Sequence, residues 1–180
     1  MKIIVLSDTH LKEVGDLPDL ILKELADADL VVHAGDFDTF EFYNELKDTV
    51  RLEAVAGNSD DYEIIRELPE THQFEVEGLK IGVTHMPIFD DFSDLVYKAR
   101  ELEVDVIIFG HTHRPFLGKF GGVVLLNPGS PTFPRFSLLS FAEIFIDDTV
   151  EIRIRGVDGE DLRGFRFDKR RKGCCGEGFG

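Results

Sequence analysis

Short aliphatic runs alternate with segments of helical periodicity in the first third of the chain, and this alternation constrains the fold most strongly. The runs are Ile3–Leu6, Leu30–Val32 and Val50–Ala56, and apolar residues recur at helical spacing in Leu17–Ala26 and Phe37–Leu46. Strands that alternate with helices form a parallel sheet covered by those helices. The sequence therefore predicts an α/β fold.

The pattern changes after Pro69, where paired strands separated by two turn residues replace the helical connections. Such hairpins add antiparallel strands to the predicted parallel sheet. We expect a short helix at Asp61–Leu68, another helix at Phe92–Leu102 and a buried strand at Val104–Phe109. The predicted hairpins are Gln73–Val76 with Leu79–Thr84, Phe116–Phe120 with Val123–Leu126, and Leu138–Ile146 with Thr149–Arg155.

Length and composition predict one domain with a short tail. The chain has 180 residues, of which 43% are hydrophobic, and we place the domain at residues 1–160. Residues 161–180 are charged and Gly-rich, so we expect a partly disordered tail there. No apolar run approaches the ~20 residues that span a membrane, and the N-terminus lacks the features of a signal peptide. A cytoplasmic protein without membrane association is the expectation.

The charge of the chain disfavours nucleic acid as a partner. The net charge is −15, and polyanions bind basic surfaces. The basic run Lys169–Lys172 is interpreted as a solvated tail. Cys174 and Cys175 are adjacent and cannot connect distant parts of a fold, so no disulfide framework is expected.

Seven side chains of metal-ligand type follow five of the predicted strands. The carboxyl ends of strands in an open α/β sheet border the ligand crevice. Seven oxygen and nitrogen ligands are too many for one tetrahedral zinc ion but suit two metal ions that share a carboxylate. Carboxylate and imidazole together favour manganese first, with nickel, iron, cobalt or zinc as alternatives. The seven are Asp8, His10, Asp36, Asn58, His85, His111 and His113.

Five motifs in order resemble the calcineurin-like metallophosphoesterases, in particular their compact bacterial and archaeal phosphodiesterase branch. The resemblance covers Met1 to about Arg155, and it includes the SDTH opening and the later NPGS. The fold that it implies is a four-layer α/β/β/α sandwich of two mixed sheets flanked by helices. The motifs are D-x-H (Asp8, His10), G-D (Gly35, Asp36), G-N-x-D (Gly57, Asn58, Asp60), T-H (Thr84, His85) and G-H-T-H (Gly110–His113).

The resemblance also implies roles for the seven residues. Asp8, His10 and His113 would hold one metal ion, and Asn58, His85 and His111 the other, with Asp36 bridging both. A hydroxide between the two ions would attack the phosphorus of a small phosphate ester. Asp36, Asn58 and His111 would then be the catalytic residues.

Two positions depart from the pattern of the larger family. Ser59 stands where a His is usual, and its hydroxyl is a poor general acid, so we predict better activity on esters with good leaving groups. Asp60 then has no His to orient and is interpreted as a cap of the Asp61–Leu68 helix. Met86 and Pro87 stand where the sequence G-H is frequent, which leaves substrate choice open.

Other polar residues have more than one interpretation. His33 is predicted to be packed or supporting, and His72 to lie at the surface. Asn127–Ser130 is a turn by composition, and the resemblance places it near the pocket, with substrate contact left open. Arg135 either contacts phosphate or forms a surface salt bridge.

Two competing functions remain at this stage. A protein-binding scaffold of the retromer-subunit type would keep the fold without the chemistry, but the ligand set here is complete. A nuclease of the double-strand-break repair type would share the motifs, but the acidic body argues against it. Several Phe residues near the pocket loops (Phe89, Phe92, Phe133, Phe136) suit either a homo-oligomer interface or an apolar substrate wall.

Overall fold

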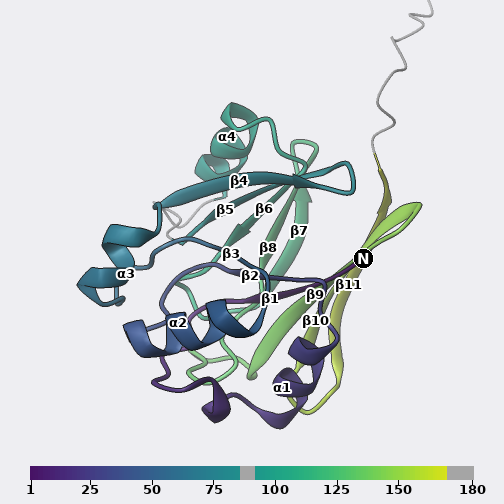
Figure 1. The fold of residues 1–180 in the computed structure, drawn as a ribbon. Helices are drawn as coiled ribbons and strands as arrows, with labels where there is room; N and C mark the ends of the chain where they lie inside the picture. Colours follow the sequence, from purple (N-terminus) through teal and green to yellow (C-terminus); the bar gives the residue numbers. More distant parts are fainter. Residues whose placement is uncertain (86–91, 170–180) are drawn as a thin grey trace, which may run out of the picture.

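Two mixed β-sheets lie face to face in the computed structural model, which describes residues 1–85 and 92–169 (Figure 1). The six-stranded sheet has the order β11-β10-β9-β1-β2-β3, and the five-stranded sheet has the order β4-β5-β6-β8-β7. The strands are β1 (Lys2–Leu6), β2 (Leu30–His33), β3 (Leu52–Ala54), β4 (Thr71–Val76), β5 (Leu79–Thr84), β6 (Val106–Phe109), β7 (Phe116–Phe120), β8 (Val123–Asn127), β9 (Ser140–Ile146), β10 (Thr149–Gly156) and β11 (Asp161–Asp168).

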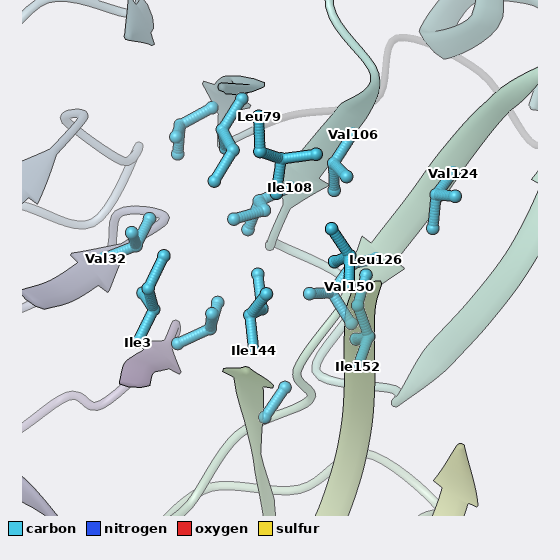
Figure 2. Packing of buried hydrophobic residues seen from close by; sticks show 14 of the residues in the cluster. Ile3, Val32, Leu79, Val106, Ile108, Val124, Leu126, Ile144, Val150 and Ile152 are labelled. Atoms are coloured by element: carbon cyan, nitrogen blue, oxygen red, sulfur yellow. The ribbon is translucent and has the colours of Figure 1, made fainter. Parts of the chain in front are cut away.

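The core between the sheets is built from the inward side chains of both. Ile3 and Val32 of the first sheet face Ile108 and Leu126 of the second, within one cluster of buried aliphatic residues (Figure 2). Strand β10 shows the pattern behind this packing, because its residues alternate strictly between partly and fully buried. The hydrophobic period of two therefore dictates which face of each strand enters the core.

Helices cover the outer face of each sheet. The helices are α1 (Asp19–Ala26), α2 (Phe40–Thr49), α3 (Tyr62–Glu67) and α4 (Ser93–Glu101), with a 3₁₀ turn at Val14–Asp16. The first three pack their apolar faces on β1 and β2, whereas Leu95 and Ala99 of α4 pack on β6 and β8. The result is the predicted four-layer α/β/β/α sandwich. None of the helices in the described ranges is long and apolar enough to cross a membrane.

Strand direction brings the functional loops together. β1, β2 and β3 run parallel in one sheet, and β5, β6 and β8 run parallel in the other. The three loops after β1 to β3 thus leave one edge of the first sheet, and those after β5, β6 and β8 leave one edge of the second. Helix α2 begins later than predicted, at Phe40, because the Thr39 side chain accepts a hydrogen bond from the Phe42 amide and caps it there.

Strand β11 corrects the expectation for the C-terminal segment. We expected a tail from residue 161, but Asp161–Asp168 pairs antiparallel with β10 and lengthens the first sheet. Phe165 and Phe167 pack against the core. These two alternating Phe residues lie among charges and Gly164, which hid the strand pattern. Residues 170–180, including Cys174 and Cys175, lie outside the described residues.

A buried ion cluster ties α1 to the middle of the first sheet. Glu143 on β9 is 2% exposed. The Arg155 guanidinium lies 3.4 Å from the Glu143 carboxylate and 3.3 Å from that of Glu24 on α1, and Lys2 also pairs with Glu24. Burial raises the pKa of Glu143, Arg155 opposes that rise and Glu24 adds to it. The carboxylate therefore stays costly to ionise despite its partners.

This raised pKa predicts a pH-dependent effect of Glu143→Gln. The folded chain holds the Glu143 proton more tightly than the unfolded chain, so the contribution of Glu143 to stability decreases as pH rises from 4.5 through the folded-state pKa. Urea unfolding of both proteins at a series of pH values between acid and neutral measures this. We expect the free energy of unfolding of Glu143→Gln to increase relative to that of the wild type as pH rises. A difference that stays constant with pH would contradict it.

Candidate metal centre

All seven predicted ligands lie in loops at the carboxyl ends of the parallel strands. Four belong to the first sheet: Asp8 and His10 follow β1, Asp36 follows β2 and Asn58 follows β3. The other three belong to the second sheet, since His85 follows β5 and the two histidines of G-H-T-H follow β6. Contacts between their side chains connect the two sets into one cluster.

Asp8 links the first strand to the G-H-T-H loop. One Asp8 oxygen lies 3.2 Å from His113 Nε2, and both oxygens accept hydrogen bonds from the His111 amide at 3.1 Å. The Ser7 hydroxyl donates to the same carboxylate at 2.6 Å. Asp8 is fully buried, so its orientation is fixed by these donors.

Asp36 and Asn58 occupy the middle of the cluster. Asp36 Oδ2 lies 3.3 Å from His85 Nε2 and 3.7 Å from His10 Nε2. Asn58 Oδ1 lies 3.1 Å from His85 Nε2 and 2.8 Å from His111 Nδ1. Asp8, His10, Asp36 and His113 each offer a ligand atom within 4.8 Å of the others, a grouping that can hold a metal ion.

Two of the histidines are held in the tautomer that metal binding needs. His85 Nδ1 lies 2.7 Å from the Ala34 carbonyl oxygen, and His113 Nδ1 contacts the Phe133 carbonyl oxygen. A carbonyl only accepts, so each Nδ1 carries a proton and each Nε2 is the ring nitrogen that faces the cluster and could bind a metal ion. Histidines that bind metals are typically oriented in this way.

The backbone of the site is strained. Asp8, His10, Asp36, His111 and His113 all have a left-handed backbone, with φ between 46° and 67°. Such conformations cost about 1–3 kcal/mol each for residues other than Gly, and they concentrate at functional sites. Five of the seven predicted ligands therefore adopt a backbone that local preference disfavours.

Two glycines allow the loops to approach closely. A Cβ on Gly57 would lie 2.2 Å from Asp36 Oδ1, and a Cβ on Gly110 would lie 2.0 Å from Ser7 Oγ. Any side chain at either position would displace a carboxylate of the cluster or the hydroxyl that supports one. Glycine is therefore required at Gly57 of G-N-x-D and Gly110 of G-H-T-H, because no side chain fits at either position.

The electrostatics of the cluster favour a bound cation. Burial raises the pKa of Asp8 to about 6, and the charge of Asp36 contributes to the rise. Burial acts in the same direction on Asp36, but the hydrogen bond and charge of His85 outweigh it and hold the pKa of Asp36 well below its usual range. Burial lowers the pKa of both His111 and His113, which favours their neutral, ligating forms. Burial would lower the pKa of His85, but its hydrogen bond to Asp36 and the charges of Asp36 and Asp8 outweigh burial and raise it. The two buried carboxylates therefore draw positive charge to this place, which a bound cation would supply.

An unpaired ring nitrogen in the cluster also indicates that the donor set fits a metal ion. His10 Nε2 is buried without a hydrogen-bond partner among the described residues, although it points at the cluster with Asp36 Oδ2 nearby. A buried ring nitrogen left unpaired is costly. A metal ion at this place would satisfy it together with Asp8, Asp36 and His113.

Asp60 corrects a prediction. It does not cap α3, whose N-cap residue is Asp61. Its carboxylate instead accepts from the backbone amides of Gly57 at 2.7 Å, Asp38 at 3.0 Å and Asp36 at 3.3 Å. Asp60 therefore joins the loop after β3 to the loop after β2, and no local sequence signal separates this role from capping.

The NPGS turn after β8 supports the site through hydrogen bonds to two of its loops. Asn127 Nδ2 donates to the Gly110 carbonyl at 2.9 Å, and the Ser130 hydroxyl donates to the Asp8 carbonyl at 2.7 Å. Both side chains are fully buried. The turn therefore positions the loops after β1 and β6, a function that its composition did not reveal.

The remaining polar candidates take different places. His33 is buried, its ring stacks on Phe37 at 3.6 Å, and its Nε2 lies 3.1 Å from Thr9 Oγ1, which confirms a packed histidine. His72 is half-buried and pairs with Glu53 at 2.7 Å. Arg135 is exposed, and the described carboxylates form no salt bridge with it. Met86 and Pro87 lie outside the described residues.

A cavity of about 500 Å³ opens beside the cluster on the side of Asn58 and His85. Thr71, Thr84 and Glu70 supply polar groups to its wall, and Lys98 of α4 supplies a positive charge. A volume of this size accommodates a small molecule. The candidate metal centre therefore borders a space for part of a substrate.

Comparison with known proteins agrees with the geometry. Residues 1–149 match the family model of the calcineurin-like phosphoesterase superfamily domain. A "probable metallophosphoesterase" of Methanocaldococcus jannaschii is 38% identical over 162 residues, which are 88% of this chain and 82% of that protein.

Two solved structures share the fold over nearly the whole chain. A predicted phosphoesterase from Streptococcus pneumoniae has 29% identity and a TM-score of 0.73, covering 93% of this chain and 97% of that one. Vps29 of Entamoeba histolytica, solved with zinc, has 28% identity and a TM-score of 0.76, covering 94% and 100%. The chain belongs to the calcineurin-like phosphoesterase superfamily.

Proposed function

We propose that this protein is a metal-dependent phosphodiesterase that hydrolyses small phosphate esters at a centre of two divalent ions. The observation that carries the proposal is the convergence of seven ligand-type side chains from both sheets, four of them within 4.8 Å of one another. Manganese is the first candidate, followed by nickel, iron, cobalt and zinc. When bound, the metal ions would supply a water nucleophile activated at neutral pH and charge for the leaving oxygen.

The residues of the chain take distinct parts in this proposal. Asp8, His10 and His113 would hold one ion, and Asn58, His85 and His111 the other, while the Asp36 carboxylate lies between the two sets. The main-chain carbonyls of Ala34 and Phe133 keep the Nε2 atoms of His85 and His113 aimed at the ions. His111 and Asn58 are less buried than Asp8 and Asp36, so we place the entry of a phosphate on their side of the cluster.

The absence of a general acid at position 59 favours activated esters. Ser59 is exposed, and its hydroxyl accepts a hydrogen bond from Asn58 Nδ2 at 3.2 Å. A hydroxyl does not deliver a proton to a poor leaving group at neutral pH. We therefore expect turnover to depend steeply on the pKa of the leaving alcohol.

Metal addition to stripped protein tests the proposal. The substrates are bis(p-nitrophenyl) phosphate and p-nitrophenyl phosphate, with each divalent metal restored in turn. We expect hydrolysis only with metal and a higher kcat/KM for the diester. Asn58→Ala is expected to lower kcat/KM by about 10²–10³-fold, in the range of a removed transition-state ligand.

The result also decides the alternative of a protein-binding scaffold, which the likeness to Vps29 favours. A folded protein that binds metal and turns over neither ester with any metal would support the scaffold. Turnover that persists in Asn58→Ala and in stripped protein would point to a contaminating enzyme and remove the support for this site.

A further inference from the structure

The loop of residues 130–137, called the rim loop below, is fastened to the candidate metal centre. The Thr132 hydroxyl donates to the Thr9 carbonyl, and the Ser137 hydroxyl donates to the His113 carbonyl at 2.9 Å. The Phe133 ring meets the rings of His10 and His113 edge-on, each at 5.9 Å. The rim loop is therefore a fixed edge of the site.

Phe136 of the rim loop combines an exposed ring with an unfavourable backbone conformation. Its side chain is 99% exposed, and its backbone is left-handed with φ of 54°. A bulky residue in that conformation is a genuine outlier, and its exposed ring gains no burial that would offset the strain. Strain of this kind accumulates where a residue is held for function.

Two arginines accompany the exposed ring. The Arg114 guanidinium lies 5.7 Å from the centre of the Phe136 ring, and Arg114 Nε donates to the Arg135 carbonyl at 3.2 Å. Arg135 is exposed and lies on the rim loop between Phe136 and Phe133, and the Phe133 ring contacts the rings of His10 and His113. Its positive charge at the edge of the site suits the phosphate of an ester.

We propose that the rim loop selects phosphate esters whose alcohol carries a planar aromatic ring, such as a nucleobase, with the ring stacked on Phe136 and the phosphate contacted by Arg135. This inference rests on the proposed phosphoesterase function and names its substrate class. An aromatic side chain stacks on any base because every base presents a π-face. Phe133 forms the apolar edge between the stacked ring and the imidazoles of His10 and His113.

An interface between copies explains the rim loop less well. The exposed apolar side chains are Phe133 and Phe136 of the rim loop and the adjoining Leu138. At about 150–250 Å² for an aromatic side chain, they fall short of the ~800 Å² that each partner buries in a stable interface. Arginines flank them, and the net charge of −15 makes two copies repel each other.

Calorimetric titration of the manganese-loaded full chain tests this selection. The probes are AMP and ribose 5-phosphate, which differ by the base, and phosphate release is assayed in the same cell so that turnover is not taken for binding. We expect AMP to bind about tenfold tighter, the effect of one stacked base. Phe136→Ala and Phe136→Leu are both expected to remove this preference, since leucine keeps apolar bulk but has no π-face. Arg135→Ala is expected to weaken both probes by the same factor.

Tyr97→Ala is the matched control, because Tyr97 is an aromatic residue on α4 that is 73% exposed. It should leave the preference unchanged. An equal affinity for both probes, or a preference that survives Phe136→Ala, would overturn the proposal. So would sedimentation showing a wild-type dimer and a Phe136→Ala monomer, which would make the rim loop an interface. A wild-type protein that hydrolyses esters normally but shows no preference for AMP would refute ring selection alone. A wild-type protein that prefers AMP but hydrolyses no ester would refute the phosphoesterase function alone.

Discussion

Asp36→Asn is expected to lower kcat/KM for phosphodiester hydrolysis by at least about 10³-fold, even with saturating metal. The Asp36 carboxylate lies between the two sets of ligands, with His85 Nε2 at 3.3 Å and His10 Nε2 at 3.7 Å. An amide has the same shape but no charge, so it cannot draw two cations together. Steady-state kinetics and the bound-metal content of the purified variant measure the effect.

The fold of this variant is expected to survive. The amide oxygen that replaces Oδ1 would still accept the hydrogen bond that the Ser59 amide gives to Asp36 at 2.8 Å. The control is Asp16→Asn, the same chemical change at an exposed position on the 3₁₀ turn, which should retain full activity. Activity of Asp36→Asn within about tenfold of the wild type would show that this carboxylate does not join the ions.

Asp60→Ala is expected to lower the free energy of unfolding by about 3–5 kcal/mol, a large effect for one loop residue. The carboxylate receives three backbone amides, from Gly57, Asp38 and Asp36. Alanine would leave these amides without acceptors in a buried place, and burial has already raised the pKa of Asp60. Urea unfolding of metal-free protein measures the stability without any contribution from bound metal.

The neighbouring residue provides the control for this change. Asp61 accepts one amide, that of Phe40 at 2.9 Å, in an exposed position. Asp61→Ala should therefore cost only about 1 kcal/mol. Equal losses for Asp60→Ala and Asp61→Ala would show that the three amides on Asp60 stabilise the fold no more than the single amide on Asp61. Asp60→Asn keeps an acceptor oxygen but loses the charge. Its loss in free energy of unfolding should lie between those of Asp60→Ala and Asp61→Ala.

The sequence could reveal most of the fold because the fold depends on local periodicity. Strands such as Ile3–Leu6 and the β9–β10 hairpin are specified by their apolar residues and turns. Strand β11 was missed because Phe165 and Phe167 are too few, among charges, to form a recognisable pattern. Its position depends on pairing with β10 and on the core beneath it, and both are tertiary effects.

The sequence could predict which residues gather in the candidate site, but not the residues that support them. Ligand-type residues after strands can be identified from order alone, and the structure brings all seven together. The hydrogen bonds of Asp60, Asn127 and Ser130 join loops that are far apart in the sequence, so spacing carries no trace of them. The left-handed backbone at His10 and His111 was equally hidden, because histidine, although enriched in that conformation, adopts it in only a small fraction of cases.

The split of the ligands between two sheets sets an order of events during synthesis. Asp8, His10, Asp36 and Asn58 emerge from the ribosome long before His111 and His113, but the early four lack the imidazoles that complete the set. On the proposed assignment of ligands, neither ion would have its full set of ligands until the second sheet has docked on the first.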